Sequence, residues 1–302
     1  MRSLRFLVQR NIALFLNNKL NIILSFASIP VVVSLYVFFL RDFLTDMVGQ
    51  SGVSPDYVQQ LTDRLMFAGL LIVINTTTCF GIIQICVNDM GTGIRKDFLI
   101  APVTPFLILS GYWLTSMLVS CVFTLLTALG GEIFFTYQYG STLPLCRQLK
   151  VLMIILFSSW INSGILLCFA HKLKSTTTFS TFANLYGTVI GFLAGAYLPY
   201  YFYPDWMKSI LLWFPPTQLT SIIRREYISV ANKWVDTGNL PGFLDAVYQN
   251  FGVDLIHKNR ILSVLQQWSI LIFALAVILL YLWVCSYEKT VGKGNSVKKE
   301  LS

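Results

Sequence analysis

Long stretches without any charged residue recur along the chain. With His counted as charged, six runs reach 20 residues or more: 20–40, 65–88, 98–131, 151–170, 175–204 and 261–287. A helix that crosses a bilayer needs about 20 apolar residues, and the strands of a membrane barrel would alternate over about ten. Leu, Ile, Val and Phe dominate these runs. The pattern predicts an all-α integral membrane protein, one domain over 1–302, with transmembrane helices at about 20–40, 65–88, 105–129, 150–170, 177–198 and 265–286.

The first 19 residues have a different pattern. Five apolar residues recur at helical spacing, while Arg5, Gln9 and Arg10 lie away from them: Leu4, Leu7, Val8, Ile12 and Phe15. This predicts a basic amphipathic helix over 1–19 that lies on the membrane surface. The alternative is a cytoplasmic extension of the first span. The segment lacks the continuous apolar stretch and the cleavage site of a signal peptide.

Composition supports a membrane protein. Charged residues make up 12% of the chain and hydrophobic ones 55%, whereas a soluble domain has about 25% charged residues. A soluble fold of this length has too little interior to bury so much apolar surface. The six Cys residues show neither a CxxC pair nor a metal-ligand spacing, so a secreted disulfide scaffold is also excluded.

The distribution of charge predicts the orientation. If both termini are cytoplasmic, 12 of the 22 basic and four of the 14 acidic residues lie inside, and ten of each lie outside. Basic residues concentrate on the cytoplasmic side of membrane proteins. We therefore expect 89–104 and the basic tail 287–302 inside and 199–264 outside. This bias and anionic lipid explain the pI of about 9.2, so no nucleic-acid partner is needed.

Residues that would support membrane-embedded chemistry are missing from the runs. His171 and His257 both lie outside the spans, no HExxH motif occurs, and no Asp or Glu lies deep in a run. This argues against a lipid-modifying enzyme and against an ion-coupled secondary transporter, which usually places carboxylates near the midplane. Gly292-Lys293 is not a phosphate-binding loop, because Tyr287 and Gly294 replace the required residues. If the chain pumps, a partner must supply the energy.

Three segments depart from an ordinary span or connector. The inner loop 88–105 combines glycines, charges and apolar residues before two prolines: Gly91, Gly93, Arg95, Lys96, Asp97, Phe98, Leu99, Ile100, Pro102 and Pro105. This pattern predicts a short amphipathic cytoplasmic helix that docks into a groove of another protein. The alternative is a helix that contacts only lipid headgroups.

The second segment, residues 192–216, follows the fifth span and contains nine aromatic residues and four prolines. Its apolar stretch is too short to cross the membrane. We interpret it as a helix that dips into the outer leaflet and returns; the alternative is an ordinary aromatic belt.

The third segment is the fifth span itself. Six small or polar residues at spacings of 4, 3, 4, 3 and 4 form one seam: Thr177, Thr181, Asn184, Thr188, Gly191 and Gly195. Such a seam either packs against another span of the same chain or forms a dimer contact or the wall of a conduit. Polar residues of the second span could face the same space: Asn75, Thr76, Thr77, Thr78, Gln84 and Asn88.

Taken in order, these features resemble the membrane permease of a type-2 ATP-binding-cassette (ABC-2) exporter. The matching residues are Ala101-Pro102-Val103-Thr104-Pro105, Gly111, Leu198-Pro199, Pro204-Asp205-Trp206, Phe214-Pro215-Pro216-Thr217 and Arg224 or Arg225. The segment 217–260 looks longer and more charged than such permeases usually have there.

The resemblance implies a bacterial cell-membrane exporter of a drug, polyketide, haemolysin pigment or glycolipid. Two permease copies would form the pathway, with spans one and five near their interface; a homodimer is expected and a heterodimer stays open. The chain would bind no cofactor, because ATP and magnesium would belong to two copies of a cytoplasmic ATPase. A coupling helix within 91–101 would contact that ATPase through Arg95, Lys96, Asp97, Phe98 and Leu99. The pathway or dimer seam would be Thr181, Asn184, Thr188, Gly191 and Gly195, and the outer gate Pro199, Tyr203, Trp206, Trp213 and Pro215.

Overall fold

The computed structural model describes residues 2–19, 22–23, 30, 33–34, 36–43, 55–94, 103–173, 175–231, 241–257 and 260–300. Its α-helices are α1 Arg2–Asn17, α4 Pro55–Gly91, α6 Pro105–Tyr139, α7 Leu145–Ala170, α8 Thr176–Leu193, α9 Asp205–Leu211, α10 Pro215–Ala231, α11 Pro241–Asn250 and α12 Val264–Glu300. A π-helical turn, η1, covers Tyr36–Leu40, and a 3₁₀ turn, η2, covers Tyr200–Phe202. Two-residue strands β1 Ile256–His257 and β2 Arg260–Ile261 pair antiparallel.

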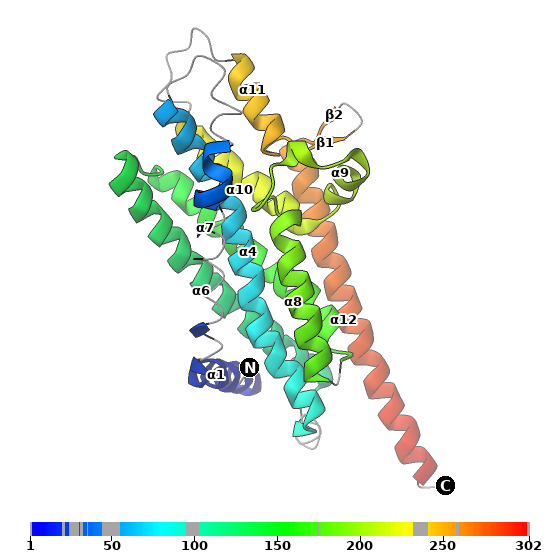
Figure 1. Ribbon diagram of the computed structural model, residues 1–302. Helices are drawn as coiled ribbons and strands as arrows, with labels where there is room; N and C mark the ends of the chain where they lie inside the picture. Colours follow the sequence, from blue (N-terminus) through cyan, green and yellow to red (C-terminus); the bar gives the residue numbers. More distant parts are fainter. Residues whose placement is uncertain are drawn as a thin grey trace.

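The long helices α4, α6, α7, α8 and α12 run side by side, and helices that follow one another in the chain run in opposite directions (Figure 1). Helix α4 packs against α6, α7, α8 and α10 and is buried over most of its length. Helix α1 lies across the end of the bundle at which both termini are found, whereas α9, α11 and the hairpin lie at the opposite end (Figure 1). We call these the inner and the outer end.

Four described helices are long and apolar enough to cross a membrane: Pro55–Gly91, Pro105–Tyr139, Leu145–Ala170 and Val264–Cys285. The predicted fifth span forms α8, whose 18 residues extend about 27 Å. Most of the predicted first span, 20–40, lies outside the described residues. The helical fold is therefore confirmed, with strand confined among the described residues to the short hairpin, and the count of six spans stays a prediction.

Helix α4 begins ten residues before the predicted boundary at residue 65. Its first turns contain Asp63 and Arg64, whose side chains are buried and bonded within the chain. Arg64 Nη2 donates to the carbonyl of Ser141 at 2.7 Å, and its guanidinium lies 4.8 Å from the centre of the Phe135 ring. Partners of this kind allow a helix to continue past the end of a charge-free run.

The apolar stripe of α1 contacts protein. Leu7, Val8 and Phe15 are buried, and α1 packs against α6 and α4. The rings of Phe15 and Phe123 of α6 meet edge to face at 5.8 Å. The stripe that the sequence assigned to the membrane surface thus covers the inner end of the bundle, while Phe6, 74% exposed, points away from it.

One polar residue of the second span, Asn75, has its partners on α6 and α7. Asn75 is fully buried and donates to Thr124 Oγ1 of α6 at 3.1 Å and to Ser159 Oγ of α7 at 2.7 Å. Asn162 of α7 donates to Asn75 Oδ1 at 3.0 Å. The expectation that Asn75 faces the seam of the fifth span is wrong: its amide joins three helices inside the bundle.

The long outer segment covers the start of α4. Buried apolar side chains from α10, α11 and the turn after α11 pack against α4: Ile228, Val247, Phe251 and Val253 against Val58, Leu61, Leu65 and Met66. The extra length noted in the sequence after residue 217 therefore builds part of a separate apolar cluster at the outer end.

Candidate functional site

The inner loop is anchored at two described points. Helix α4 ends at Gly91, and α6 begins at Pro105, where the Thr104 hydroxyl accepts from the Leu107 amide at 3.3 Å. The residues predicted to contact an ATPase lie outside the described residues: Arg95, Lys96, Asp97, Phe98 and Leu99. Both attachment points belong to long helices able to span a membrane, and the loop joins these two helices in the sequence.

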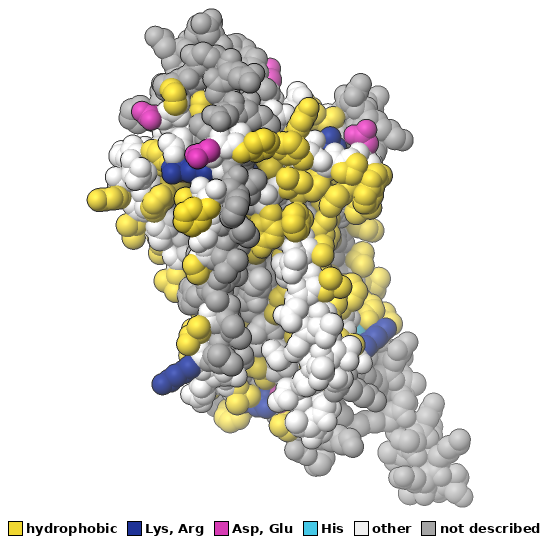
Figure 2. All heavy atoms as spheres, in the orientation of Figure 1, with side chains coloured by type: hydrophobic (Ala, Val, Ile, Leu, Met, Phe, Trp, Pro, Cys, Tyr) yellow, Lys and Arg dark blue, Asp and Glu magenta, His cyan; other side chains and the backbone are white. Residues whose placement is uncertain are grey.

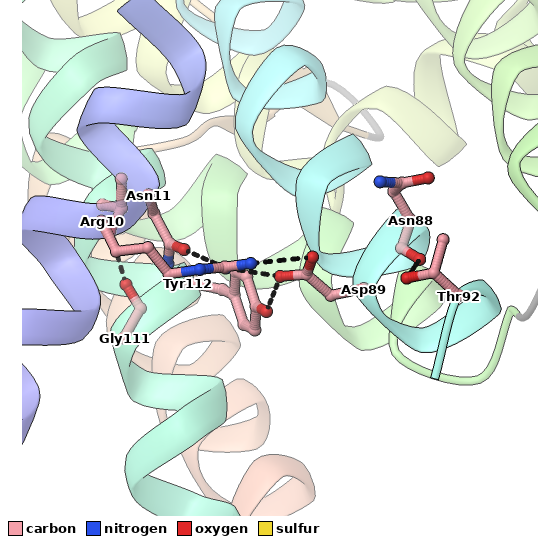
Figure 3. Close-up of polar contacts among 8 residues, drawn as sticks. Arg10, Asn11, Asn88, Asp89, Thr92, Gly111 and Tyr112 are labelled. Carbon is pink, nitrogen blue, oxygen red and sulfur yellow. Dashed lines mark hydrogen bonds and ion pairs between the residues drawn. The ribbon is translucent and has the colours of Figure 1, made fainter. Parts of the chain in front are cut away.

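The last turn of α4 carries a buried carboxylate, Asp89, which has partners on α1 and α6 (Figure 3). Arg10 of α1 donates to its two oxygens, with Nη1–Oδ2 at 2.6 Å and Nη2–Oδ1 at 3.0 Å. The Tyr112 hydroxyl of α6 donates to the same carboxylate. The hydrogen bond to Asp89 raises the pKa of Arg10, so the guanidinium stays protonated near neutral pH. One carboxylate therefore links α1, the end of α4 and the start of α6.

This cluster was not predicted from the sequence, because Arg10 and Asp89 were counted only as charges on the cytoplasmic side of the membrane. Asp89 directly follows the charge-free run 65–88, and it is 2% exposed. A carboxylate at the edge of a span needs a hydrogen-bonding or charged partner when it is buried. The predicted basic amphipathic helix could have been recognised as the source of that partner.

The first part of the predicted seam on α8 faces away from the bundle. Thr181, Asn184 and Thr188 are exposed, and α8 buries Phe179 and Ile190. The two Thr hydroxyls donate to carbonyls of their own helix, at 3.1 Å and 3.0 Å. Over the lower part of α8, side chains that are neither hydrophobic nor charged predominate (Figure 2). This part of the seam has an open, uncharged polar surface on the described chain.

The last two residues of the predicted seam, Gly191 and Gly195, do not extend this exposed face. A Cβ at Gly191 would lie 2.0 Å from the ring of Tyr197, which packs back on the helix. Gly195 lies beyond the end of α8, with a φ of +68° that favours glycine. The periodicity failed here because the chain reverses after Leu193, so Gly191 and Gly195 are packed within this turn.

The predicted outer gate forms η2, α9 and the start of α10. Pro199 precedes η2 and Pro215 begins α10. The Tyr203 hydroxyl donates to the carbonyl of Phe192 at the end of α8 and to that of Leu198 in the turn after it, the latter at 3.3 Å. Trp206 and Trp213 are 67% and 71% exposed. Hydrophobic side chains gather over α9 and the outer end of α8 (Figure 2). Beyond the outer end of α8 the segment forms the short elements η2 and α9 before α10 begins. Its dip into the outer leaflet stays a prediction.

Arg224 of α10 holds this outer end together through main-chain carbonyls. It donates to Leu65 of α4 at 3.0 Å, to Gly195 at 2.6 Å, and to Phe251 after α11. The side chain is 3% exposed, and burial lowers its pKa to about 10, so it remains protonated at neutral pH. Three segments distant in sequence are thereby bonded to one guanidinium.

The model of the family described as ABC-2 type transporter matches residues 2–226. The chain belongs to the ABC-2 type transporter family. It is therefore the permease subunit of an ABC transporter, a membrane component. Neither the curated proteins nor the solved structures gave a match.

The matched region of the permease runs from α1 into α10. Asp89 and its two partners lie within it, as does Arg224. Helix α11, the hairpin and α12 follow it; α12 packs against α7 and α6. The matched part thus contains the whole inner cluster, and at the outer end it contains Arg224 with its partners Leu65 and Gly195, whereas the third partner, Phe251, follows it.

Proposed function

We propose that this permease exports an amphipathic or lipid-like small molecule across a bacterial cell membrane, driven by a separate ATPase. Its membership of the ABC-2 family over residues 2–226 carries the proposal. Both termini, the end of α4 and the start of α6 lie at the inner end (Figure 1). We assign this end to the cytoplasm from the basic bias of the segments expected there. The open face of α8 is polar but uncharged, which suits an amphipathic cargo better than an ion.

The proposed coupling element is the loop after α4. A ligand shifts a conformational equilibrium only by binding its states differently, so an ATPase must hold a surface that moves with the spans. Residues Arg95–Leu99 join α4 to α6 and present two apolar side chains beside three charges. Docking would bury Phe98 and Leu99 and leave the charges at the rim, where they set the register of the contact. ATP and magnesium belong to two copies of that ATPase subunit.

Co-purification of the ATPase tests this proposal. Burying one large apolar side chain stabilises a contact by roughly 1.5–3 kcal/mol, about a tenfold to hundredfold change in affinity. Phe98→Ala is expected to lower both ATPase pull-down and export, with normal membrane insertion. Lys174→Ala, in the loop between α7 and α8, is the control and should retain both. Full binding and full export by Phe98→Ala would remove the coupling role of this loop.

The open face of α8 supports the proposal that a second copy of the permease completes the pathway. Close packing of small and polar side chains is a common way for membrane helices to associate. In a Cys-free version, Asn184→Cys is expected to form a disulfide between copies in the membrane under mild oxidation. Ser209→Cys, exposed on α9 at the outer end, is the matched control. Heterodimerisation would give cross-linking to a different chain, and equal yields from both positions would argue against this face as an interface.

A further inference from the structure

A cavity of about 470 Å³ opens between the segment around Tyr36, α4 and α6, in the outer part of the bundle. Its volume lies within the range of about 300–1,000 Å³ found for small-molecule sites. Apolar side chains form most of its wall, among them Phe67 and Leu70 of α4 and Leu126 and Phe134 of α6. The cavity is separate from the exposed face of α8 described above.

Two adjacent glycines of α6 shape this cavity. A Cβ at Gly130 would meet nothing within 4 Å, so this residue leaves the hollow open. A Cβ at Gly131 would lie 2.0 Å from the ring of Phe67, which therefore occupies the neighbouring space. Phe67 is held edge to face against Phe135 at 5.3 Å. This part of the wall is thus a packed aromatic surface beside Gly130, where no side chain occupies the adjoining space.

The polar end of the cavity has its charges matched within the chain. Arg41 donates to Asp63 at 2.8 Å and to the Tyr139 hydroxyl at 3.0 Å, and Tyr36 and Tyr139 both donate to Asp63. Asp63 is 7% exposed. Because cation and carboxylate already neutralise each other, this end provides no net charge for an ionic ligand. The recognition chemistry that remains is apolar.

We expect the cavity to open toward the hydrocarbon of the bilayer. Val37, Leu126 and Phe134 at its rim are 40–54% exposed, and α6 is one of the helices able to span a membrane. Water needs two to four polar partners, which the apolar wall does not provide, and an empty void forfeits dispersion contacts. We propose that this cavity binds one hydrocarbon chain, supplied either by a membrane phospholipid or by an amphiphile, independently of the export function proposed above.

Photolabelling of the intact permease tests this site. The probe is a phosphatidylcholine with a diazirine at the end of its palmitoyl chain, placed in phosphatidylcholine nanodiscs. Adducts are expected at Phe67 and Leu70 in the cavity wall, and also at Val122, which is 53% exposed on α6 and reports contact with bulk lipid. Absence of adducts at Phe67 and Leu70 in the wild type, both with this probe and with the single-chain amphiphile described below, would overturn the proposal.

Matched variants separate the cavity from general lipid contact. Gly130→Leu adds a branched side chain at a position where a Cβ would meet nothing within 4 Å. It should lower the adducts at Phe67 and Leu70 at least fivefold, with Val122 unchanged. Leu129→Phe, at an exposed neighbouring position outside the cavity lining, should leave all three unchanged. Equal labelling of Phe67 and Leu70 in Gly130→Leu, shown to be folded by its thermal transition, would contradict the site.

A second probe distinguishes the two sources of the chain. It carries the same diazirine chain on a single-chain trimethylammonium amphiphile added from the aqueous phase. Cavity labelling by the phosphatidylcholine probe alone assigns the site to a membrane lipid, and labelling by the amphiphile alone assigns it to cargo-like molecules. Labelling by both supports a site selective only for hydrocarbon. Loss of ATPase coupling in Phe98→Ala bears on the proposed function and leaves these outcomes unaffected.

Discussion

The two ends of the bundle are held together by different kinds of bonds. At the inner end, Arg10 and Tyr112 donate to the side chain of Asp89, so each partner is a side chain on its own helix. At the outer end, Arg224 donates to three main-chain carbonyls, which belong to α4 and to the turns after α8 and α11. Side-chain pairs can re-form after a helix shifts, whereas a guanidinium bonded to three backbone segments fixes their relative positions. The bonds at the inner end therefore allow its helices to move when a partner binds there, whereas the bonds at the outer end keep its segments rigid.

Removal of Arg224 should have the largest effect. Each hydrogen bond from a charged donor contributes roughly 1.5–3 kcal/mol, and Arg224→Met would leave three carbonyls without this donor. We expect a loss of more than about 3 kcal/mol and a markedly lower thermal transition of the purified protein. Arg225→Met is the control, because Arg225 and Asp254 form a partly exposed pair that contributes about 1 kcal/mol or less. Equal shifts for both variants would show that Arg224 does not frame the outer end.

Breaking the inner cluster should have a smaller effect on stability and a larger one on coupling. A double-mutant cycle with Arg10→Ala and Asp89→Asn should give an interaction energy of about 1–3 kcal/mol, since the residues are in contact. Because Asp89 lies next to the loop, each single variant should also reduce ATPase stimulation by cargo. Arg5→Ala, at an exposed basic position of the same helix, should change neither. Strictly additive transitions, with unchanged ATPase stimulation, would argue against a link between α1 and the loop.

The positions of the helices were predictable from the sequence where the need to cover apolar side chains alone determined them. Continuous apolar runs located α4, α6, α7 and α12, because each helix must present apolar side chains to lipid or to its neighbours. The start of α4 was placed too late, because the buried partners of Asp63 and Arg64 come from segments distant in sequence. Asn75 was given the wrong face for the same reason: its amide partners are on α6 and α7.

The candidate sites were predictable only as far as helical periodicity extends. It placed Thr181, Asn184 and Thr188 on one exposed face, and it failed at Gly195, where the chain has left the helix. No local pattern pairs Arg10 with Asp89, since 79 residues separate them. The proposed coupling residues Arg95–Leu99 stay a prediction of the sequence.

The smallest expected effects on stability come from glycine-to-alanine substitutions, which test how far the packing at each end can shift to accept an added methyl group. A Cβ at Gly69 of α4 would lie 2.9 Å from the Cα of Ala196, which is main chain, in the outer part of the bundle. At the inner end, a Cβ at Gly111 would lie 3.1 Å from the Cβ of Leu7 on α1. Overpacking costs about 1–3 kcal/mol where the surroundings are rigid. Alanine also gains up to about 1 kcal/mol of helix propensity over glycine.

We therefore expect Gly69→Ala to destabilise the permease and Gly111→Ala to be close to neutral, because α1 can move by a few tenths of an ångström where the turn fixed by Arg224 resists. The thermal transitions of the two variants in the same detergent give the comparison. Gly187→Ala, whose Cβ would meet nothing within 4 Å, isolates the gain from helix propensity. If Gly111→Ala lowered the transition as much as Gly69→Ala, α1 would be packed as rigidly as the outer turn. Movement of the inner end would then have to come from the loop after α4 alone.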